Sequence, residues 1–265
     1  MSKVDLLEKY GPAALVTGAS SGIGEAYAKL LAAAGFDLLL VARRVDRLEQ
    51  NATELGEKYG VNIQCLKADL ADPLAIAAID NAAQALDIGL LVNNAGFGLK
   101  GPHHLNDAVQ LNEMLQVNCI APMQLSYQII PRLLSRGSGA LLFTGSVEGI
   151  MGFPNSSAYA GSKAFVQNFA ESLWGELEDK NIDVLVLEPG STDTEALDKQ
   201  GVDRSKLLGM MSAEAVAQIG LDNIANGPVM IAGEENAQMF TGLSQMPRRD
   251  ALRMMAKTMA DSLVD

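Results

Sequence analysis

Tyr159 and Lys163 stand four residues apart in the stretch Tyr159-Ala160-Gly161-Ser162-Lys163. Residues at this spacing share one face of a helix, so the phenol and the ammonium are expected to be neighbours. An isolated phenol has a pKa of about 10 and is a poor base at neutral pH, but a nearby cation favours the phenolate. The pair could therefore exchange a proton with a substrate oxygen. Taken separately, Tyr159 could be a packing residue and Lys163 a solvated charge.

A second group of residues has the composition of an anion-binding turn. The segment TGASSGIG, from Thr17 to Gly24, follows the apolar run 13–17 and leads into a predicted helix. Glycines let the backbone turn sharply and let a pyrophosphate approach closely, and a helix N-terminus offers free N–H groups to the anion. The alternative is a tight turn without a ligand. The position directly after the first apolar run favours phosphate binding.

Four motifs occur in a fixed order along the chain, namely TGASSGIG, NNAG at 93–96, Ser146 and YAGSK at 159–163. This ordered set resembles the signature of the short-chain dehydrogenase/reductase family, and the resemblance extends from residue 10 to about residue 195. It implies an alcohol dehydrogenase or ketone reductase that works by direct hydride transfer. In such an enzyme the protein supplies orientation and a proton.

The resemblance implies roles for four catalytic residues. Tyr159 would be the general acid or base, and Lys163 would also hold the nicotinamide ribose hydroxyls. Ser146, thirteen residues before Tyr159, would steady the substrate oxygen as charge develops there. Asn118 would hold a water that links Lys163 to solvent. Taken singly, Ser146 could be a strand-end hydrogen bonder and Asn118 a buried polar group satisfied by backbone, but the combination favours a catalytic site.

The resemblance also implies a set of cofactor contacts, in which the backbone at Thr192 and the hydroxyl of Thr194 would anchor the nicotinamide carboxamide. Asn93 would lie near the adenosine, although a structural hydrogen bond to a neighbouring strand is an equal alternative. No role follows for Glu188, which precedes Pro189. The complete expected set is Gly18, Ser20, Ser21, Gly22, Ile23, Gly24, Arg43, Asp69, Leu70, Asn93, Ala95, Gly96, Tyr159, Lys163, Pro189, Gly190, Thr192 and Thr194.

The end of the second predicted strand bears on the choice between NAD and NADP. An acidic residue there would bind the ribose hydroxyl of NAD. This chain has Ala42 at that position, followed by Arg43 and Arg44. The guanidinium of Arg43 can pair with a 2′-phosphate. The alternative, a solvated start to the next helix, places positive charge at an unfavourable helix end. We therefore expect NADP(H) as the cofactor.

Asp69 closes the third predicted strand, where the resemblance places a contact with the adenine amino group. Its alternative role is to cap the following helix. Asp72-Pro73 suits that role better, because Asp is a preferred N-cap and Pro fits the first helical position. We therefore expect Asp69 at the adenine and a helix that begins at Pro73.

The elements that would position these residues follow from seven short apolar runs that alternate with helical patterns. The runs lie at 13–17, 38–42, 61–66, 88–92, 140–144, 182–187 and 228–232. Runs without strict alternation are typical of strands covered on both faces. The pattern predicts an α/β fold with a Rossmann-type doubly wound, mainly parallel seven-stranded sheet and helices on both faces. We expect one catalytic domain over 1–265, with a substrate-loop region at about 191–211 and a C-terminal helical tail at about 247–265.

Charge and composition exclude several classes of function. The chain has 20 Lys and Arg against 32 Asp and Glu, a formal net charge of −12, which disfavours nucleic acid and anionic membranes as partners. No apolar stretch suits an export signal or a membrane span. Cys65 and Cys119 are far apart, and His103-His104 lacks a third ligand at metal spacing, so we expect neither disulfides nor a metal site. A cytoplasmic protein is expected.

The expected partner is a small-molecule substrate, a lipophilic ketone or secondary alcohol, because the segments that should border it are mainly apolar. Methionines such as Met210 and Met211 suit an adaptable pocket, although ordinary packing is an alternative. Glu148 could instead recognise a polar group. The tail from Pro247 could pack on its own chain, join subunits or touch a membrane, and the overall acidity favours the first two. The resemblance suggests a homodimer or homotetramer.

Two other classes of function are alternatives. An NADP-sensing scaffold without turnover would need the glycine turn but not the set Ser146, Tyr159 and Lys163. An epimerase or dehydratase of the same family is the second alternative, although such relatives are commonly longer and use a different glycine spacing.

Overall fold

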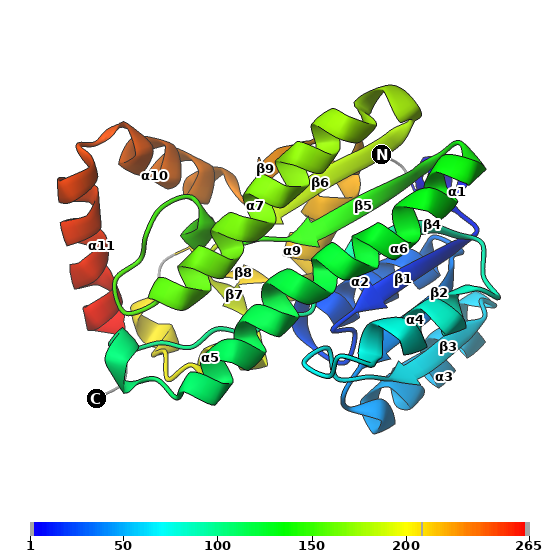
Figure 1. The fold of residues 1–265 in the computed structure, drawn as a ribbon, viewed down its shortest axis with the longest axis horizontal. Coiled ribbons are helices and arrows are strands. Elements are labelled where there is room, and N and C mark those ends of the chain that lie inside the picture. Colours follow the sequence, from blue (N-terminus) through cyan, green and yellow to red (C-terminus); the bar gives the residue numbers. More distant parts are fainter. Residues whose placement is uncertain (1–2, 208, 263–265) are drawn as a thin grey trace.

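The computed structural model describes residues 3–207 and 209–262, built around a seven-stranded sheet (Figure 1). The strands are β1 (Ala13–Thr17), β2 (Asp37–Ala42), β3 (Ile63–Lys67), β4 (Ile88–Asn93), β5 (Gly139–Thr144), β6 (Ile182–Glu188) and β9 (Val229–Ile231). Their order is β3-β2-β1-β4-β5-β6-β9, and every neighbouring pair is parallel. The predicted doubly wound α/β fold is confirmed, and each of the seven apolar runs overlaps a strand.

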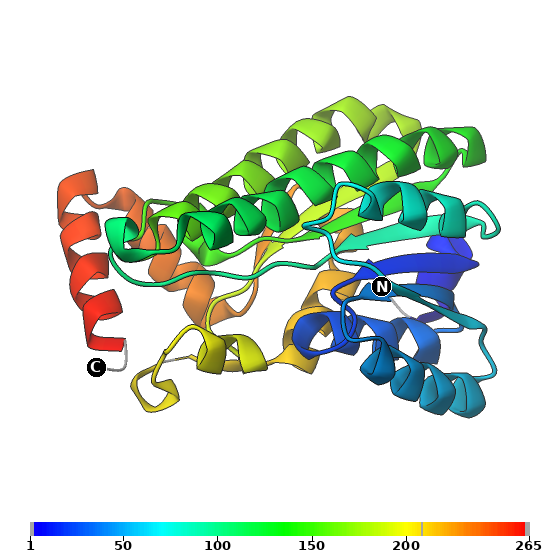
Figure 2. The ribbon, with the colours of Figure 1, turned by 60° about the horizontal axis from the view of Figure 1, so that its bottom comes forward.

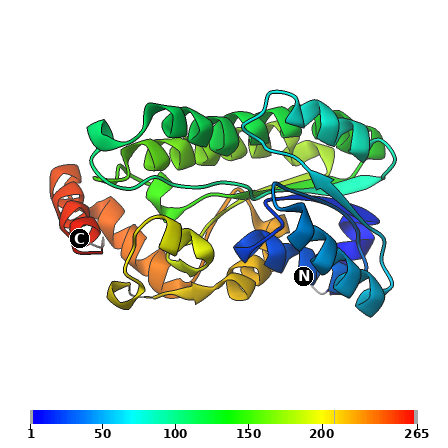
Figure 3. The same ribbon diagram turned by 90° about the horizontal axis from the view of Figure 1, so that it is seen from below.

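Helices cover both faces of the sheet, as Figure 3 shows. One face carries α1 (Lys3–Tyr10), α2 (Gly22–Ala33), α3 (Val45–Tyr59) and α9 (Ala213–Asp222), and the other carries α4 (Ala75–Ala83), α5 (Ala108–Leu115), α6 (Ala121–Arg136) and α7 (Ser157–Leu177). Successive strand residues point to opposite faces. In β1, Leu15 therefore packs in the core under α6 and α7, whereas Val16 packs in the core under α2 and α9. This double coverage explains why the runs are apolar without alternation.

Shorter elements lie in the connections between these strands and helices. They are the 3₁₀ turns η1 (His103–Leu105), η3 (Val147–Gly149), η4 (Glu178–Lys180), η5 (Arg204–Lys206) and η6 (Ile224–Asn226), the π-helical turn η2 (Gln116–Ile120), helix α8 (Glu195–Lys199), and the strands β7 (Thr192–Asp193) and β8 (Met211–Ser212). β7 and β8 pair in parallel. The predicted substrate-loop region therefore begins and ends at one small two-stranded ribbon.

The helix boundaries depend on local signals, one of which was predicted. Gly35, with φ +94°, follows the C-cap of α2, as is common where a helix ends. The predicted start of a helix at Pro73 is wrong, because α4 begins at Ala75. The carboxylate of Asp72 instead accepts from the N–H of Leu74 at 2.9 Å. The Asp-Pro pair therefore forms a turn that precedes the helix.

The C-terminal part forms α10 (Glu234–Gln245) and α11 (Arg248–Ser262) at one end of the molecule (Figure 2). Ala251 and Met255 of α11 share a core with Phe240 of α10 and with Val147 and Phe153. Of the alternatives for the tail, packing on its own chain is therefore what the structure shows up to residue 262; residues 263–265 lie outside the described part. No helix among the described residues has the length and apolar composition to cross a membrane.

Candidate active site

The candidate residues meet at the edge of the sheet where the parallel strands end. The glycine turn follows β1, the NNAG segment begins at the last residue of β4, Ser146 follows β5, and Pro189 follows β6. β1 lies between β2 and β4, so the strand order changes direction there. A crevice at this position is the usual nucleotide site of an open α/β sheet.

The glycine turn depends on backbone groups that approach one another closely. Gly18 and Gly22 have left-handed backbones, with φ of +69° and +58°. A Cβ on Gly24 would lie 2.3 Å from Gly18 O and 2.4 Å from Asn94 Nδ2, so no side chain fits there. Ser21, the N-cap of α2, makes no side-chain cap. The first N–H groups of α2 therefore face a turn that could hold a phosphate.

Asn94 anchors this turn, a role that the sequence analysis missed. Its Nδ2 donates to Thr17 O at 3.0 Å, and its Oδ1 accepts from Thr144 Oγ1 at 3.2 Å. The backbone N–H groups of Asn94 and Ala95 both donate to Thr17 Oγ1. The side chain thus ties together the ends of β1, β4 and β5. The second Asn of NNAG was the available signal.

Asn93 and Leu70 are both buried. Asn93 is 6 % exposed, and its Nδ2 lies 3.4 Å from Ser126 Oγ on α6. Asn93 thus makes a structural hydrogen bond, although the partner belongs to a helix and not to a strand. Its contact near the adenosine stays a prediction. Leu70 packs in the core under α4, α6 and α7.

Arg43 and Arg44 leave β2 in different directions. Arg44 donates to the hydroxyls of Ser20 (Nε, 3.3 Å) and Ser21 (Nη2, 2.5 Å). Arg43 is exposed, and its Nη1 lies 3.9 Å from Asp69 Oδ2. The structure thus brings Arg44 to the glycine turn, whereas the sequence analysis assigned only Arg43 to the cofactor. Both arginines remain candidates for a 2′-phosphate contact.

The segment after β6 closes over the same turn. Thr194, whose hydroxyl caps α8, has its Cγ2 3.0 Å from the position that a Cβ on Gly22 would take. Glu195 Oε2 lies 2.7 Å from Arg44 Nη1, and Glu195 Oε1 pairs with Arg47. Hydrogen bonds from Arg47 and Arg44 lower the pKa of Glu195 to about 2. The carboxylate is therefore an anion held against the arginine at the turn.

The other residues predicted to contact the cofactor after β6 are held in place mainly through backbone groups. Pro189 O accepts from the N–H of Val147 at 3.1 Å, which joins this segment to the one that follows β5. A Cβ on Gly190 would lie 2.7 Å from Asn236 Nδ2 on α10. Thr192 is buried, and its hydroxyl donates to Gly190 O at 3.1 Å. These contacts set the path of the chain from β6 to α8.

Tyr159 and Lys163 lie side by side on α7, as their spacing predicts. Lys163 Nζ lies 5.7 Å from the centroid of the Tyr159 ring and donates to Thr144 O at 2.7 Å. Burial lowers the pKa of Lys163 to about 8. Burial and the charge of Glu148 raise the pKa of Tyr159, and a hydrogen bond with Ser146 lowers it. The phenol is thus a proton donor in this environment, and additional positive charge would be needed to ionise it.

Asn118 and Ser146 border this pair. Asn118 lies in the π-helical turn η2, where its Oδ1 accepts from Phe97 N (3.1 Å) and its Nδ2 donates to Phe97 O (2.9 Å). A Cβ on Gly96 would lie 3.0 Å from Asn118 Oδ1 and 3.4 Å from Lys163 Nζ. Ser146 is buried and its Oγ accepts from Glu148 N at 3.2 Å. The four expected catalytic residues and Gly96 therefore form one group.

A second lysine faces Tyr159, and the sequence analysis missed it. Lys100 Nζ lies 5.1 Å from the centroid of the same ring, and the Lys100 side chain is only 5 % exposed. It pairs with Glu148, for which the sequence analysis offered a substrate contact. A lone lysine after a glycine-rich loop gave no signal of this contact.

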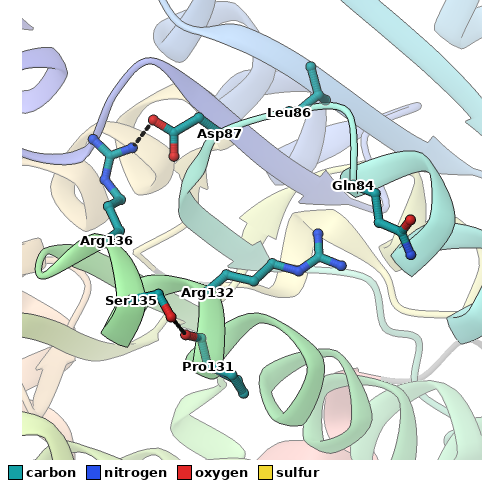
Figure 4. A pocket seen from close by; sticks show the side chains of 7 residues that line it. All are labelled: Gln84, Leu86, Asp87, Pro131, Arg132, Ser135 and Arg136. Carbon is teal, nitrogen blue, oxygen red and sulfur yellow. Dashed lines mark hydrogen bonds and ion pairs between the residues drawn. The ribbon is translucent and has the colours of Figure 1, made fainter.

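A different pocket, with a volume of about 770 Å³, lies away from these groups (Figure 4). Its lining residues come from the segment between α4 and β4 and from the end of α6, namely Gln84, Leu86, Asp87, Pro131, Arg132, Ser135 and Arg136. Arg132 pairs with Asp80 at 2.5 Å, and Arg136 with Asp87 at 2.6 Å. Its cations are neutralised, so we do not assign it a ligand. Within the described part of the chain, no three or more His, Cys, Asp or Glu side chains gather in a way that could hold a metal ion.

A parallel sheet with a phosphate-type turn where the strand order reverses, and with a Tyr-Lys pair beside that turn, defines a dinucleotide-dependent oxidoreductase. The family model described as short chain dehydrogenase matches residues 12–205, and the chain belongs to this family. The resemblance inferred from the four motifs is confirmed. The enzyme is an oxidoreductase that acts on hydroxyl or keto groups.

Relatives of known name match almost the whole chain. A 7beta-hydroxysteroid dehydrogenase of Clostridium sardiniense is 31 % identical over 251 residues, which cover 94 % of this chain and 96 % of the relative. A very-long-chain 3-oxoacyl-CoA reductase of Anas platyrhynchos is 31 % identical over 255 residues, which cover 94 % and 80 %. A solved short-chain dehydrogenase from Sphingobium yanoikuyae in complex with NADPH superposes with a TM-score of 0.82 at 32 % identity, covering 92 % and 96 %.

Proposed function

We propose that this enzyme uses NADP(H) to interconvert a bulky, lipophilic ketone and its secondary alcohol, with Tyr159 as general acid and base. The observation that carries the proposal is the contact of half-buried Tyr159 with buried Lys163, next to Gly96 at the mouth of the glycine turn. A phenol and an ammonium held together beside a dinucleotide site can deliver a proton to an oxygen while a hydride moves at the adjacent carbon.

The residues present fit a dinucleotide, which when bound would supply or accept the hydride. Gly18, Gly22 and Gly24 leave a cradle that a Cβ would fill, and the N-terminus of α2 offers N–H groups to a pyrophosphate. Arg44 at the turn and Arg43 beside it supply cations for a 2′-phosphate, and Ala42 leaves no carboxylate to select NAD. A solved relative in complex with NADPH supports the same cofactor.

The catalytic residues would divide the work as follows. Lys163 would hold the nicotinamide ribose and place a positive charge near the Tyr159 phenol, which favours the ionised form during alcohol oxidation. In ketone reduction Tyr159 would donate its proton to the substrate oxygen. The hydroxyl of Ser146 would bind the same oxygen as negative charge develops. Asn118, whose amide holds the Phe97 backbone, would keep the segment beside Lys163 in place and support the water next to it.

The substrate class is supported by the apolar segment that follows Ser146 and by the names of two relatives. Val147, Met151 and Phe153 follow Ser146 and pack with the C-terminal helices α10 and α11. Two relatives are named for lipophilic substrates, a hydroxysteroid and a very-long-chain 3-oxoacyl-CoA. Both this apolar segment and these names support a bulky, lipophilic ketone or alcohol.

A panel assay tests this proposal. The purified enzyme is mixed with NADPH or NADH and with a keto steroid, a very-long-chain 3-oxoacyl thioester or a small ketone such as acetone, and the absorbance of the reduced nicotinamide is followed. We expect oxidation of NADPH with a bulky ketone, slower oxidation of NADH, and little reaction with acetone. NADPH binding without turnover of any ketone or alcohol would favour the alternative of an NADP-sensing scaffold. Product formation without net NADPH consumption would favour an epimerase or dehydratase.

We also propose a homodimer or homotetramer in the cytoplasm. Tyr127 and Leu134 of α6 and Phe165 of α7 are large apolar side chains exposed on the same layer of the molecule, being 76 %, 42 % and 38 % exposed. Contact with another copy would remove them from water. Cys65 and Cys119 are both free thiols, which suits a reducing compartment. Sedimentation equilibrium of the purified protein tests the oligomeric state.

A further inference from the structure

The loop after β4 carries a buried lysine that contacts two polar side chains from other elements. Lys100 Nζ lies 2.5 Å from Glu148 Oε1 on η3 and 2.9 Å from Ser156 Oγ. Ser156 Oγ donates to Glu148 Oε2 at 2.5 Å. Each of the three side chains thus contacts the other two. We call these three residues the Lys100 cluster.

Lys100 joins this cluster to the Tyr159 ring. Lys100 Nζ lies 5.1 Å from the ring centroid, within the range of a cation–π contact. A Cβ on Gly98 would lie 3.0 Å from Tyr159 Cδ2, so the absence of a side chain there lets the ring lie against the loop that carries Lys100. The loop, η3 and the start of α7 therefore meet at this ring.

Two features of the Lys100 cluster reduce the stability that it can contribute, if its role is only to pack the interior. An ion pair with side chains 5 % and 15 % exposed loses most of its hydration, and apolar residues can often replace such a pair without loss of stability. Ser156 is the N-cap of α7, yet its hydroxyl makes no cap bond and is committed to Glu148 and Lys100 instead. These losses call for a role that apolar packing could not perform.

We propose that the Lys100 cluster is a positioning unit for Tyr159, which fixes the ring for proton transfer and balances the charge around its phenol. This inference rests on the proposed role of Tyr159 in proton transfer, but it concerns residues to which that proposal assigns no part in the reaction. Lys100 and Glu148 act on the reaction through Tyr159 and not by contact with the substrate.

The charges around Tyr159 come from three elements and act in opposite directions. Lys163 on α7 and Lys100 on the loop are cations 5.7 Å and 5.1 Å from the ring centroid. Glu148 on η3 is the anion, and its charge raises the pKa of Tyr159. The charge of Lys163 lowers the pKa of the Cys119 thiol on η2, but burial has the larger effect and raises this pKa to about 11. Because Lys100 neutralises Glu148, removal of either partner should leave the other's charge unbalanced beside the phenol.

Site-specific titration of the phenol tests this inference. Tyr159 is replaced by 3,5-difluorotyrosine, whose more acidic phenol titrates in the range where proteins are stable, and the fluorine NMR signal is followed against pH. We expect Lys100→Met to raise the pKa at position 159 by about one unit or more, and Glu148→Gln to lower it by a similar amount. The double variant should lie between the two single variants. Failure of either single variant to shift in its stated direction would overturn the proposal.

Controls separate the charge effect from folding. Lys29 and Glu25 form an ion pair of the same 2.5 Å length on α2, so Lys29→Met and Glu25→Gln should leave the titration at position 159 unchanged. A shift in these controls would count against a local effect of the Lys100 cluster. If Lys100→Met fails to fold, comparison of Glu148→Gln with the neutral double variant still gives the direction in which each charge shifts the pKa at position 159.

The titration requires neither cofactor nor turnover. An enzyme that reduces no ketone would contradict the proposed function and leave the titration result intact. Normal turnover with unchanged titrations would contradict only the role of the Lys100 cluster.

Discussion

The cofactor side and the catalytic side of the site place their charges differently. Beside the glycine turn, backbone groups form the cradle, and the side chains of Arg44 and Glu195 are 37 % and 39 % exposed. Around Tyr159, the charged side chains are almost entirely enclosed, with Lys163 and Lys100 both 5 % exposed. Exposed ion pairs contribute little and are screened by salt, whereas buried charges shift pKa values strongly. We therefore expect changes on the cofactor side to alter affinity and changes on the catalytic side to alter rate and pH dependence.

The largest expected effect is on the catalytic side, at the phenol itself. Tyr159→Phe keeps the ring and its packing but removes the proton that the substrate oxygen needs. We expect kcat to fall by about 10²- to 10⁴-fold, with the dissociation constant for NADPH nearly unchanged, as measured by steady-state kinetics and by fluorescence titration. Tyr127→Phe, on the exposed surface of α6, is the matched control. Retained turnover in Tyr159→Phe would contradict the assignment of proton transfer to the catalytic side.

A buried acid on the catalytic side provides a test of stability. Glu188, at the end of β6, is 0 % exposed, and neither carboxylate oxygen has a hydrogen-bond partner among the described residues. Burial first, and then the charge of Glu171, raises the pKa of Glu188 from 4.5 to about 8. The unfolded chain therefore releases this proton at lower pH than the folded chain does. The free energy of unfolding should fall as the pH rises from about 4.5 to about 8.

Glu188→Gln should remove this pH dependence and stabilise the protein at neutral pH by about 3 kcal/mol. Urea denaturation at pH 5 and pH 8 measures the difference between the variant and the parent protein. The exposed acid Glu176 on α7 supplies the control variant Glu176→Gln, which should show the parent pH dependence. An unchanged pH dependence in Glu188→Gln would mean that this carboxyl is ionised in the folded protein.

The two sides also differ in how far the sequence predicted them. The strands and the glycine turn are encoded by neighbouring residues, so local patterns sufficed to predict the sheet and the place of Gly18, Gly22 and Gly24. The partners of Lys100 are 48 and 56 residues away along the chain, and no spacing rule links such positions. Pairing of this kind depends on how the loop after β4 meets η3 and α7, which only the folded chain defines.

On the cofactor side, the sequence identified the pair of cations but not which one lies against the turn. We expect Arg44→Ala and Arg43→Ala each to weaken NADPH binding more than NADH binding. Arg44→Ala should have the larger effect, of about 10- to 100-fold for a charge-assisted contact, because Arg44 alone reaches Ser20 and Ser21 among the contacts described. Isothermal titration with both cofactors measures the difference, and Arg132→Ala on α6 is a control. Equal losses for NADPH and NADH would contradict the assignment of a 2′-phosphate contact.

The smallest expected effect is at Glu195, the anion that pairs with the same arginine. A 2′-phosphate and this carboxylate would compete for Arg44, so Glu195→Gln should tighten NADPH binding. Because the pair is partly exposed, the gain should be only about two- to fivefold at low salt and should vanish at high salt. Glu214 lines the same surface pocket as Glu195, so Glu214→Gln tests whether any loss of negative charge there has the same effect. A gain that persists at high salt would show that Glu195 acts by closing α8 over the turn, through the contact of Thr194 with Gly22, and not by occupying the guanidinium.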